Sequence, residues 1–187
     1  MPFINQSLDP TVAAKKIILN EHELKLNVLA CRQLGAKVVL TIGSWDMLHI
    51  GHVRYLIKAQ NQGDILVVGV DSDRAVKKYK GEFRPIIPES ERREMLCYLS
   101  CVDFITTVDD VDDNGKWQYR LLKLLNPDVF VAVEDSYPEE QCADIRRHAS
   151  ELVVLPRQAE STSSTQIIQT LIKGNPDIVR QIMETKS

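Results

Sequence analysis

The stretch GSWDMLHIGH, residues 43–52, joins a strand pattern to a helix pattern and sets the architecture that the flanking segments must follow. It comes directly after VVLTI at residues 38–42, an apolar run typical of a buried strand. Open α/β sheets bind phosphates at such junctions, where backbone N–H groups and the positive end of a helix dipole meet an anion. His49 and His52 share one side of the first helical turn, and Gly51 allows a ligand close to the backbone. We therefore expect two imidazoles and a helix terminus to face one anion.

The same alternation of strand and helix continues on both sides of this junction. The hydrophobic pattern and its breakers predict helices over residues 23–34, 50–62, 73–79, 89–100, 117–125 and 138–148 and from 161–165 onward, with strands over 37–42, 64–70, 102–108, 128–133 and 152–155. This order predicts an α/β fold with a doubly wound, Rossmann-like parallel sheet. The loops that follow the strands then meet along one sheet edge and can share one cleft.

Further motifs follow the two histidines in an order known from one family. They are VRYL at 53–56, GDILVVGVDSD at 63–73, KG at 80–81, RPI at 84–86, ER at 91–92 and VD at 102–103. Together they resemble the H-x-G-H nucleotidyltransferases (cytidylyltransferase-like), which include glycerol-3-phosphate cytidylyltransferase and the adenylyltransferase domain of ADP-heptose synthase. The resemblance covers residues 24–172 and implies the HIGH-type nucleotidyltransferase fold.

The resemblance also implies a reaction. A nucleoside monophosphate passes from a nucleoside triphosphate to the phosphate of a small sugar or polyol phosphate, and pyrophosphate is released. ATP and CTP both remain open as donors, with AMP transfer favoured because residues 63–73 and 84–86 lean toward the adenylyltransferase branch. Mg²⁺ is expected as the cofactor because it arrives with the triphosphate.

Catalysis of this reaction calls for charge stabilisation, since a phosphate monoester is already an adequate nucleophile. His49 and His52 are placed to donate hydrogen bonds to the reacting phosphates, although an isolated pair of this kind can also simply cap or pack a helix start. Arg92 matches an arginine of the family, and its forked guanidinium suits a triphosphate. We expect these three residues to be catalytic.

The remaining site residues fall into three groups. Nucleotide binding is assigned by resemblance to Ile42, Gly43, Ser44, Trp45, Gly51, Arg157, Ser161, Thr162, Ser163, Ser164 and Thr165. The substrate phosphate is assigned to Lys77, Lys80 and Arg84, and a supporting role to Asp46, Glu134 and Asp135. The hydroxyl run at 161–165 is also a good N-cap, and both functions can hold at once. Asp46 is expected to orient its loop by accepting backbone hydrogen bonds.

One segment departs from the family. Residues 132–137 read AVEDSY where the heptose-phosphate adenylyltransferases carry K-G-G-D, so a lysine is missing and two acids are gained. That position faces the nucleotide in the family. The departure leaves room for a different base or sugar specificity.

Length and composition limit the class of protein. With 187 residues we expect an N-terminal arm at 1–20 and one nucleotidyltransferase domain at 21–187. The net charge of -3 and pI of about 5.8 argue against nucleic acid as a partner. No apolar stretch long enough to span a bilayer and no signal peptide are visible, which predicts a cytoplasmic protein without membrane contact. The four cysteines lack metal-ligand spacing, so no metal site is expected, and a homodimer is possible by resemblance.

Two other readings compete with a nucleotidyltransferase. The string HIGH also occurs in class I aminoacyl-tRNA synthetases, but this chain is short, is not basic and has no K-M-S-K-S loop. The stronger rival is a non-catalytic nucleotide-binding regulatory module of the same fold. The two histidines, Arg92 and the hydroxyl run favour the enzyme, because binding alone does not require donors to a transition state.

Overall fold

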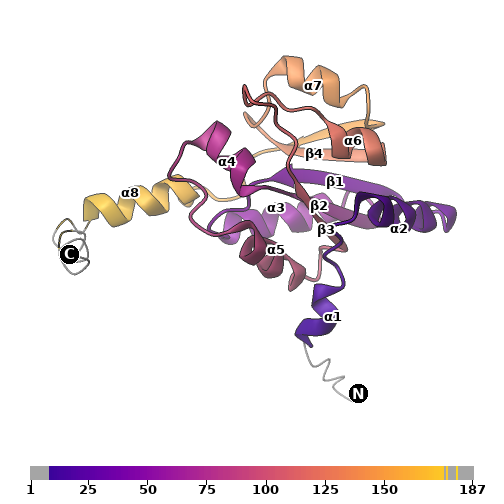
Figure 1. Cartoon of the computed structure of the whole chain (residues 1–187), viewed down its shortest axis with the longest axis horizontal. Helices are drawn as coiled ribbons and strands as arrows, with labels where there is room; N and C mark the ends of the chain where they lie inside the picture. The colour runs from indigo at the N-terminus through magenta and orange to yellow at the C-terminus, as the bar shows by residue number, and fades with distance from the viewer. Residues whose placement is uncertain (1–8, 175, 177–179, 181–187) are drawn as a thin grey trace.

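The computed structural model describes residues 9–174, 176 and 180. Its centre is a five-stranded parallel sheet in the order β3-β2-β1-β4-β5 (Figure 1). The strands are β1 (Val38–Gly43), β2 (Ile65–Asp71), β3 (Phe104–Val108), β4 (Val129–Val133) and β5 (Glu151–Leu155). The predicted doubly wound sheet is confirmed.

The strand order places β1 between β2 and β4. Leu40 of β1 is in register with Val67 of β2 on one side and with Phe130 of β4 on the other, and all three side chains are fully buried. The apolar run of each central strand is explained by this burial on both faces. Because the chain moves from β1 to β2 and β3 in one direction and returns to β4 and β5 in the other, the loops after β1 and β4 diverge and open a crevice.

Helices cover both faces of the sheet. Side chains of α1 (Pro10–Ala14), α3 (Ile50–Gln60) and α5 (Glu89–Cys97) pack in the core on one face, and those of α2 (Glu21–Gln33), α6 (Arg120–Leu125) and α7 (Glu139–Ile145) pack on the other. Figure 1 shows α3 and α5 on the side of the sheet opposite α6 and α7. Two helices remain, α4 (Asp73–Lys80) and α8 (Ser164–Gly174), and both lie beyond the carboxyl ends of strands.

Helix limits differ from expectation at several ends. The predicted helix at 117–125 starts only at Arg120, because Trp117 pairs with Val111 in an antiparallel bridge and the Gln118 amide donates to the Asp110 carbonyl. The predicted helix at 89–100 ends at Cys97. At Trp117 a tertiary contact overrides a continuous helical pattern.

Part of the expected N-terminal arm packs against the sheet. Ile17 forms a parallel bridge with Ile105 of β3, and the Ile18 amide donates to the Ile105 carbonyl at 2.8 Å. Ala13 and Ile18 are buried in the two layers of the core. Residues 1–8 of that arm, and residues 175, 177–179 and 181–187 of the expected domain, lie outside the described residues.

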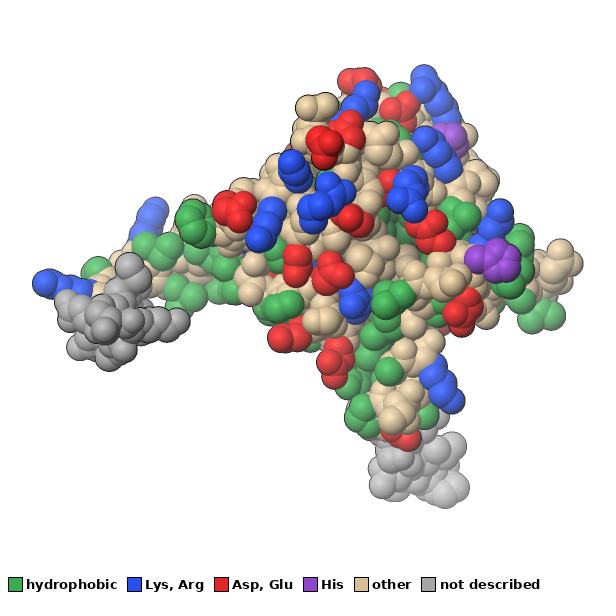
Figure 2. All heavy atoms as spheres, in the orientation of Figure 1, with side chains coloured by type: hydrophobic (Ala, Val, Ile, Leu, Met, Phe, Trp, Pro, Cys, Tyr) green, Lys and Arg blue, Asp and Glu red, His purple; other side chains and the backbone are tan. Residues whose placement is uncertain are grey.

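Helix α8 projects from the body of the molecule (Figures 1 and 2). None of its residues is buried, and Leu171 and Ile172 are each more than half exposed. On the face shown in Figure 2, Lys and Arg side chains are interspersed with Asp and Glu. No helix within residues 9–174 is long and apolar enough to cross a membrane.

Candidate active site

A cavity of about 800 Å³ lies at the carboxyl ends of the strands, where the loops after β1 and β4 diverge. Ile42 of β1, Asp71 of β2 and Val133 of β4 contribute to its wall from the ends of their strands, and Arg157 follows β5. This is the position at which doubly wound folds bind ligands.

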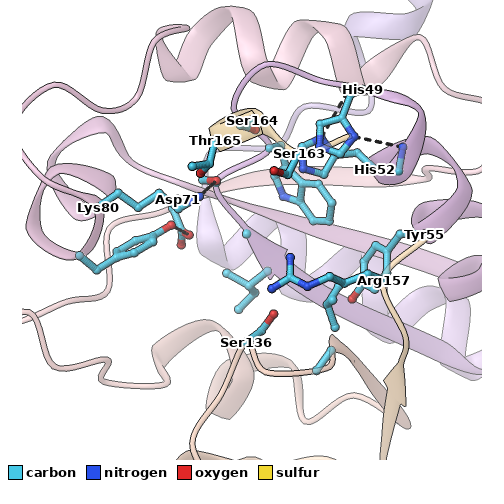
Figure 3. A pocket seen from close by; sticks show the side chains of 18 of the residues that line it. His49, His52, Tyr55, Asp71, Lys80, Ser136, Arg157, Ser163, Ser164 and Thr165 are labelled. Carbon is cyan, nitrogen blue, oxygen red and sulfur yellow. Dashed lines mark hydrogen bonds between the residues drawn. The ribbon is translucent and has the colours of Figure 1, made fainter. Parts of the chain in front are cut away.

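The two histidines stack on each other at the start of α3. Their ring centroids are 3.9 Å apart, and His49 is the N-cap residue. The Nδ1 of His49 accepts from the Gly51 amide at 3.1 Å, and the Nδ1 of His52 accepts from the His49 amide at 3.4 Å (Figure 3). A neutral imidazole that accepts at Nδ1 carries its proton on Nε2. Each ring can therefore donate one N–H bond to a ligand.

The environment keeps these imidazoles neutral. Burial lowers the pKa of His49. Burial also lowers the pKa of His52 to about 3, reinforced by the charge that His49 carries when protonated and by the charge of Lys80. Two stacked imidazolium ions would repel each other, which acts in the same direction. At neutral pH the pair is a set of hydrogen-bond donors without net charge.

The loop between β1 and α3 has an unusual backbone. Trp45 and Met47 both have positive φ values, 52° and 53°, a conformation that residues other than glycine rarely adopt. The Trp45 side chain anchors the loop to β2, because its Nε1 donates to the Gly69 carbonyl at 2.9 Å. Its ring also packs edge-on against the His52 ring, with centroids 5.7 Å apart. The loop conformation thus supports the histidine pair directly.

Asp46, which lies between Trp45 and Met47 in the sequence, is fully buried and contacts segments from other parts of the chain. Its carboxylate accepts from the amides of Ile86 and Ile87 and forms an ion pair with Arg84 at 2.7 Å. Burial alone would raise the pKa of Asp46, but these two amides and Arg84 together lower it. Its backbone carbonyl accepts from the Ser164 hydroxyl at 2.7 Å. Asp46 therefore connects the first loop to residues 84–87 and to the start of α8.

Two cationic side chains line the cavity near β2. Lys80 donates to the Ser44 hydroxyl at 2.7 Å, and burial and the neighbouring Arg84 lower the pKa of Lys80. Asp71 also lines the cavity and accepts from the Tyr79 hydroxyl at 2.6 Å. Burial raises the pKa of Asp71 to about 6.

The hydroxyl run reaches the cavity where α8 begins. Thr162, Ser163, Ser164 and Thr165 line it together with the two histidines, and the Ser163 hydroxyl accepts from the Gln166 amide at 3.1 Å. The run caps its helix and borders the cavity at the same time.

Most of the site residues expected from sequence lie around this cavity. Those that line it are Ile42, Gly43, Ser44, Trp45, His49, Gly51, His52, Lys80, Arg84, Arg157, Thr162, Ser163, Ser164 and Thr165. Those that do not are Asp46, Lys77, Arg92, Glu134, Asp135 and Ser161. Lys77 instead pairs with Glu82, and Glu134 accepts from the Arg157 amide.

Arg92 differs most from expectation. Its side chain is fully buried and does not line the cavity. The guanidinium donates to the carbonyls of Ser44, Asp71 and Ile87 and pairs with Asp73 at 2.8 Å. It thus fastens the ends of β1 and β2 to the start of α5. In this structure the guanidinium does not reach the cavity, so the expected contact of Arg92 with a triphosphate stays a prediction.

Several lining residues were not singled out from sequence. Among them are Tyr55, Asp71, Tyr79, Trp117, Tyr137 and Gln141. The position of Asp71 at the end of a strand was a usable signal, since such positions face the crevice. Trp117 and Tyr137 carried no local signal, because their rings meet only in the fold, with centroids 5.4 Å apart.

Known proteins resemble this chain in sequence and in fold. The profile of the cytidylyltransferase-like family matches residues 40–171. Two relatives, each named bifunctional protein HldE, are 38% identical: that of Geobacter metallireducens over 75% of this chain and 28% of its own length, and that of Shigella sonnei over 82% and 31%. The chain therefore spans about three-tenths of the length of these relatives.

Solved structures give a matching result. A lipopolysaccharide core biosynthesis protein from Thermoplasma volcanium is 25% identical with a TM-score of 0.57, covering 67% of this chain and 100% of its own. A pantoate-beta-alanine ligase from Francisella tularensis also reaches a TM-score of 0.57, at 14% identity, covering 81% of this chain and 75% of its own. The second likeness concerns the fold alone.

Proposed function

The chain belongs to the cytidylyltransferase-like family and is a nucleotidyltransferase, and from this premise we propose that it transfers AMP from ATP to the phosphate of a small sugar or polyol phosphate. An oxygen of the acceptor phosphate attacks the α-phosphorus. A bond forms between them as the bond from the α-phosphorus to the β-phosphate oxygen breaks. The products are a nucleoside diphosphate ester and pyrophosphate, and no covalent enzyme intermediate is needed.

The stacked histidine pair carries this proposal. Both Nδ1 atoms accept from backbone amides, so each neutral ring carries its proton on Nε2 and can donate it toward the reacting phosphates. Donors held rigidly where negative charge develops stabilise a transition state without reorganisation. A module that only bound nucleotide would have no need for this arrangement.

The other lining residues fit the remaining parts of the reactants. The amides and hydroxyls at the start of α8, with Arg157, suit the β- and γ-phosphates. Lys80 and Arg84 suit the acceptor phosphate on the other side of the histidines. Arg92 and Asp46 hold the loops that present these groups.

The side chains around the cavity are compatible with Mg²⁺ that enters bound to the nucleotide. Within residues 9–174 no cluster of three or more His, Cys, Asp or Glu side chains could hold a metal ion. Mg²⁺ characteristically keeps several waters and binds substrate phosphates with few protein ligands. When bound, it would neutralise charge on the triphosphate, whose oxygens the histidines and hydroxyls of this chain contact.

Two observations support the finer choices. The preference for AMP rests on the resemblance of residues 63–73 and 84–86 to the adenylyltransferase branch of the family. The sugar class is supported by the neighbour described as a lipopolysaccharide core biosynthesis protein. CTP stays in the experiment as the alternative donor.

Pyrophosphate release in the presence of Mg²⁺ tests the proposal. ATP and CTP are offered separately with sugar, polyol and simple alcohol phosphates. We expect release that requires ATP together with one acceptor, and a roughly 100- to 1,000-fold lower turnover in His52→Ala. His22→Ala, which changes an exposed histidine of α2, is the matched control. Bound nucleotide without release for any acceptor would contradict the transferase and favour a regulatory module.

A further inference from the structure

The cavity has two halves that meet at the histidine pair. Ser44, Asp71, Tyr79, Lys80 and Arg84 line it on the β2 side, and Ser136, Tyr137 and Arg157 line it on the β4 and β5 side. The 162–165 run lies between the two, where the Ser164 hydroxyl donates to the Asp46 carbonyl. Figure 3 shows Asp71 and Lys80 on one side of the cavity and Arg157 on the other. The halves therefore differ in the elements and in the chemistry that line them.

The geometry of phosphoryl transfer assigns each half a reactant. Attacking and leaving oxygens lie roughly in line across the phosphorus. If pyrophosphate lies beside Arg157, as the proposed function has it, the acceptor approaches from the opposite, β2 side of the cavity (Figure 3). Lys80 and Arg84 are the cations that its phosphate meets there.

One pair on the β2 side has no part in that reaction as described so far. The Asp71 carboxylate accepts from the Tyr79 hydroxyl at 2.6 Å, and among the described residues no other side chain or amide donates to it. Both residues line the cavity. An ionised carboxylate beside an acceptor phosphate is unfavourable unless it faces a hydrogen-bond donor of that acceptor.

The pair presents hydrogen-bond acceptors and no donor. The Tyr79 proton is already directed at Asp71, so the phenol oxygen offers only its lone pairs, as the carboxylate does. Two such oxygens 2.6 Å apart suit neighbouring hydroxyl groups on one molecule. A simple alkyl group in the same place would remove water from the remaining lone pairs of both oxygens and offer no hydrogen bond in exchange.

We propose that Asp71 and Tyr79 are specificity-determining residues that accept hydrogen bonds from hydroxyl groups of the acceptor, next to the phosphate held by Lys80 and Arg84. The acceptor is then a phosphate whose neighbouring carbons carry hydroxyls, as in a sugar or polyol phosphate. This inference rests on the proposed function and adds the residues that select the substrate class.

Matched acceptors test the inference. D-Glucose 1-phosphate is compared with 2-deoxy-D-glucose 1-phosphate, and glycerol 3-phosphate with propyl phosphate, by kcat/KM for pyrophosphate release. The wild-type chain should favour the hydroxylated member of the productive pair by about tenfold or more, the size of one or two hydrogen bonds. Tyr79→Phe and Asp71→Asn should each reduce that ratio, by slowing the hydroxylated acceptor only. The KM for ATP should not change.

Tyr98→Phe is the control, since it removes a phenol hydroxyl that bonds Glu94 outside the cavity, and its ratio should equal that of the wild type. An unchanged ratio in both cavity variants, or an equal loss for both members of a pair, overturns this inference while the transferase stands. No release by the wild-type chain with any acceptor overturns the proposed function, and this inference with it.

Discussion

Burial sets the protonation state of His52, and this state suits the donor role proposed for it. An ordinary histidine exchanges its proton near neutral pH, whereas burial holds the pKa of this one at about 3. A donor that stays neutral over the working range loses no activity to its own titration. The low pKa also reduces the free energy of unfolding at acidic pH, because His52 binds a proton in the unfolded chain and not in the folded chain.

That cost gives a pH-dependent prediction for stability. Between about pH 6.5 and pH 3 the unfolded state holds more protons at this position, so the free energy of unfolding falls as pH falls, by at most about 1.4 kcal/mol per pH unit. His52→Asn keeps an acceptor for the His49 amide but removes the titration. Urea unfolding at pH 7, 6 and 5 should show the wild type losing stability relative to this variant. Parallel pH profiles for the two proteins would contradict a buried neutral imidazole.

Arg92 acts on the site through the backbone. Its guanidinium satisfies three buried carbonyls, and lysine, with a single ammonium, cannot reach all of them. We expect Arg92→Lys to lower the free energy of unfolding by about 2–4 kcal/mol, since each buried carbonyl left unpaired costs about 1–3 kcal/mol. Chemical denaturation measures this, with Arg147→Lys at an exposed ion pair as the control. Unchanged stability with lost turnover would restore the direct role in catalysis that the family resemblance suggests.

At the scale of elements, the start of α3 depends on a residue without a side chain. A Cβ on Gly51 would lie 2.8 Å from the His49 ring and 3.0 Å from the Cβ of Ala159, both too close. Alanine in a helix normally adds roughly 0.5–1 kcal/mol of stability over glycine. Here the added methyl must displace the ring of His49.

Gly51→Ala should therefore lose turnover, by about tenfold or more if His49 moves by even a fraction of an ångström, and should show little or none of the usual helix stabilisation. Pyrophosphate release and thermal unfolding measure the two effects. Gly174→Ala places the same methyl in open space at the end of α8 and should leave turnover unaltered. Wild-type turnover in Gly51→Ala would show that the ring can shift without consequence.

The elements themselves were largely predictable from sequence. Each strand is an apolar run bounded by polar or breaking residues, and such runs carry their own signal. The junction at 43–52 was equally predictable, since a strand, a glycine and an amphipathic helix follow one another. The helix at 117–125 was predicted too long, because its first turn is taken by pairing between Trp117 and Val111, two segments of one long loop.

The site was only partly predictable for the same reason. Residues in the junction or in the segments that follow the strands could be placed from the chain order, as His49 and the 162–165 run were. Arg92 could not, because its spacing in a helix does not reveal whether the guanidinium points to the cavity or into the protein. The aromatic wall made by Trp117 and Tyr137 joins residues twenty positions apart that only the fold brings together.

At the scale of the whole molecule, a short segment near the N-terminus pairs with the edge strand β3 and extends the sheet by one position. The main chain at residues 16–18 pairs with β3, so a segment before the first helix of the alternating pattern covers an edge that would otherwise expose unpaired amides. Ile18 is 7% exposed, and the adjacent Leu19 is 58% exposed.

Ile18→Ala should lower the free energy of unfolding by about 2–4 kcal/mol, as large-to-small changes in a core do. Leu19→Ala, next to it in sequence, should change stability by less than about 0.5 kcal/mol. Chemical denaturation of the two variants is a direct comparison. Equal stability of the two would show that this segment contributes no core packing and that the domain proper begins after it, as the division at residue 21 supposes.

The position of Asp46 has a consequence for how the two substrates influence each other. One aspartate fastens the start of α8 through its carbonyl and residues 84–87 through its carboxylate, so the two halves of the cavity share a mechanical link. If a ligand orders one half of the cavity through Asp46, the affinity of the other half changes, and thermodynamic linkage makes the factor identical in both directions. We expect positive cooperativity between donor and acceptor, so that a productive ternary complex assembles at concentrations where neither partner alone would be retained.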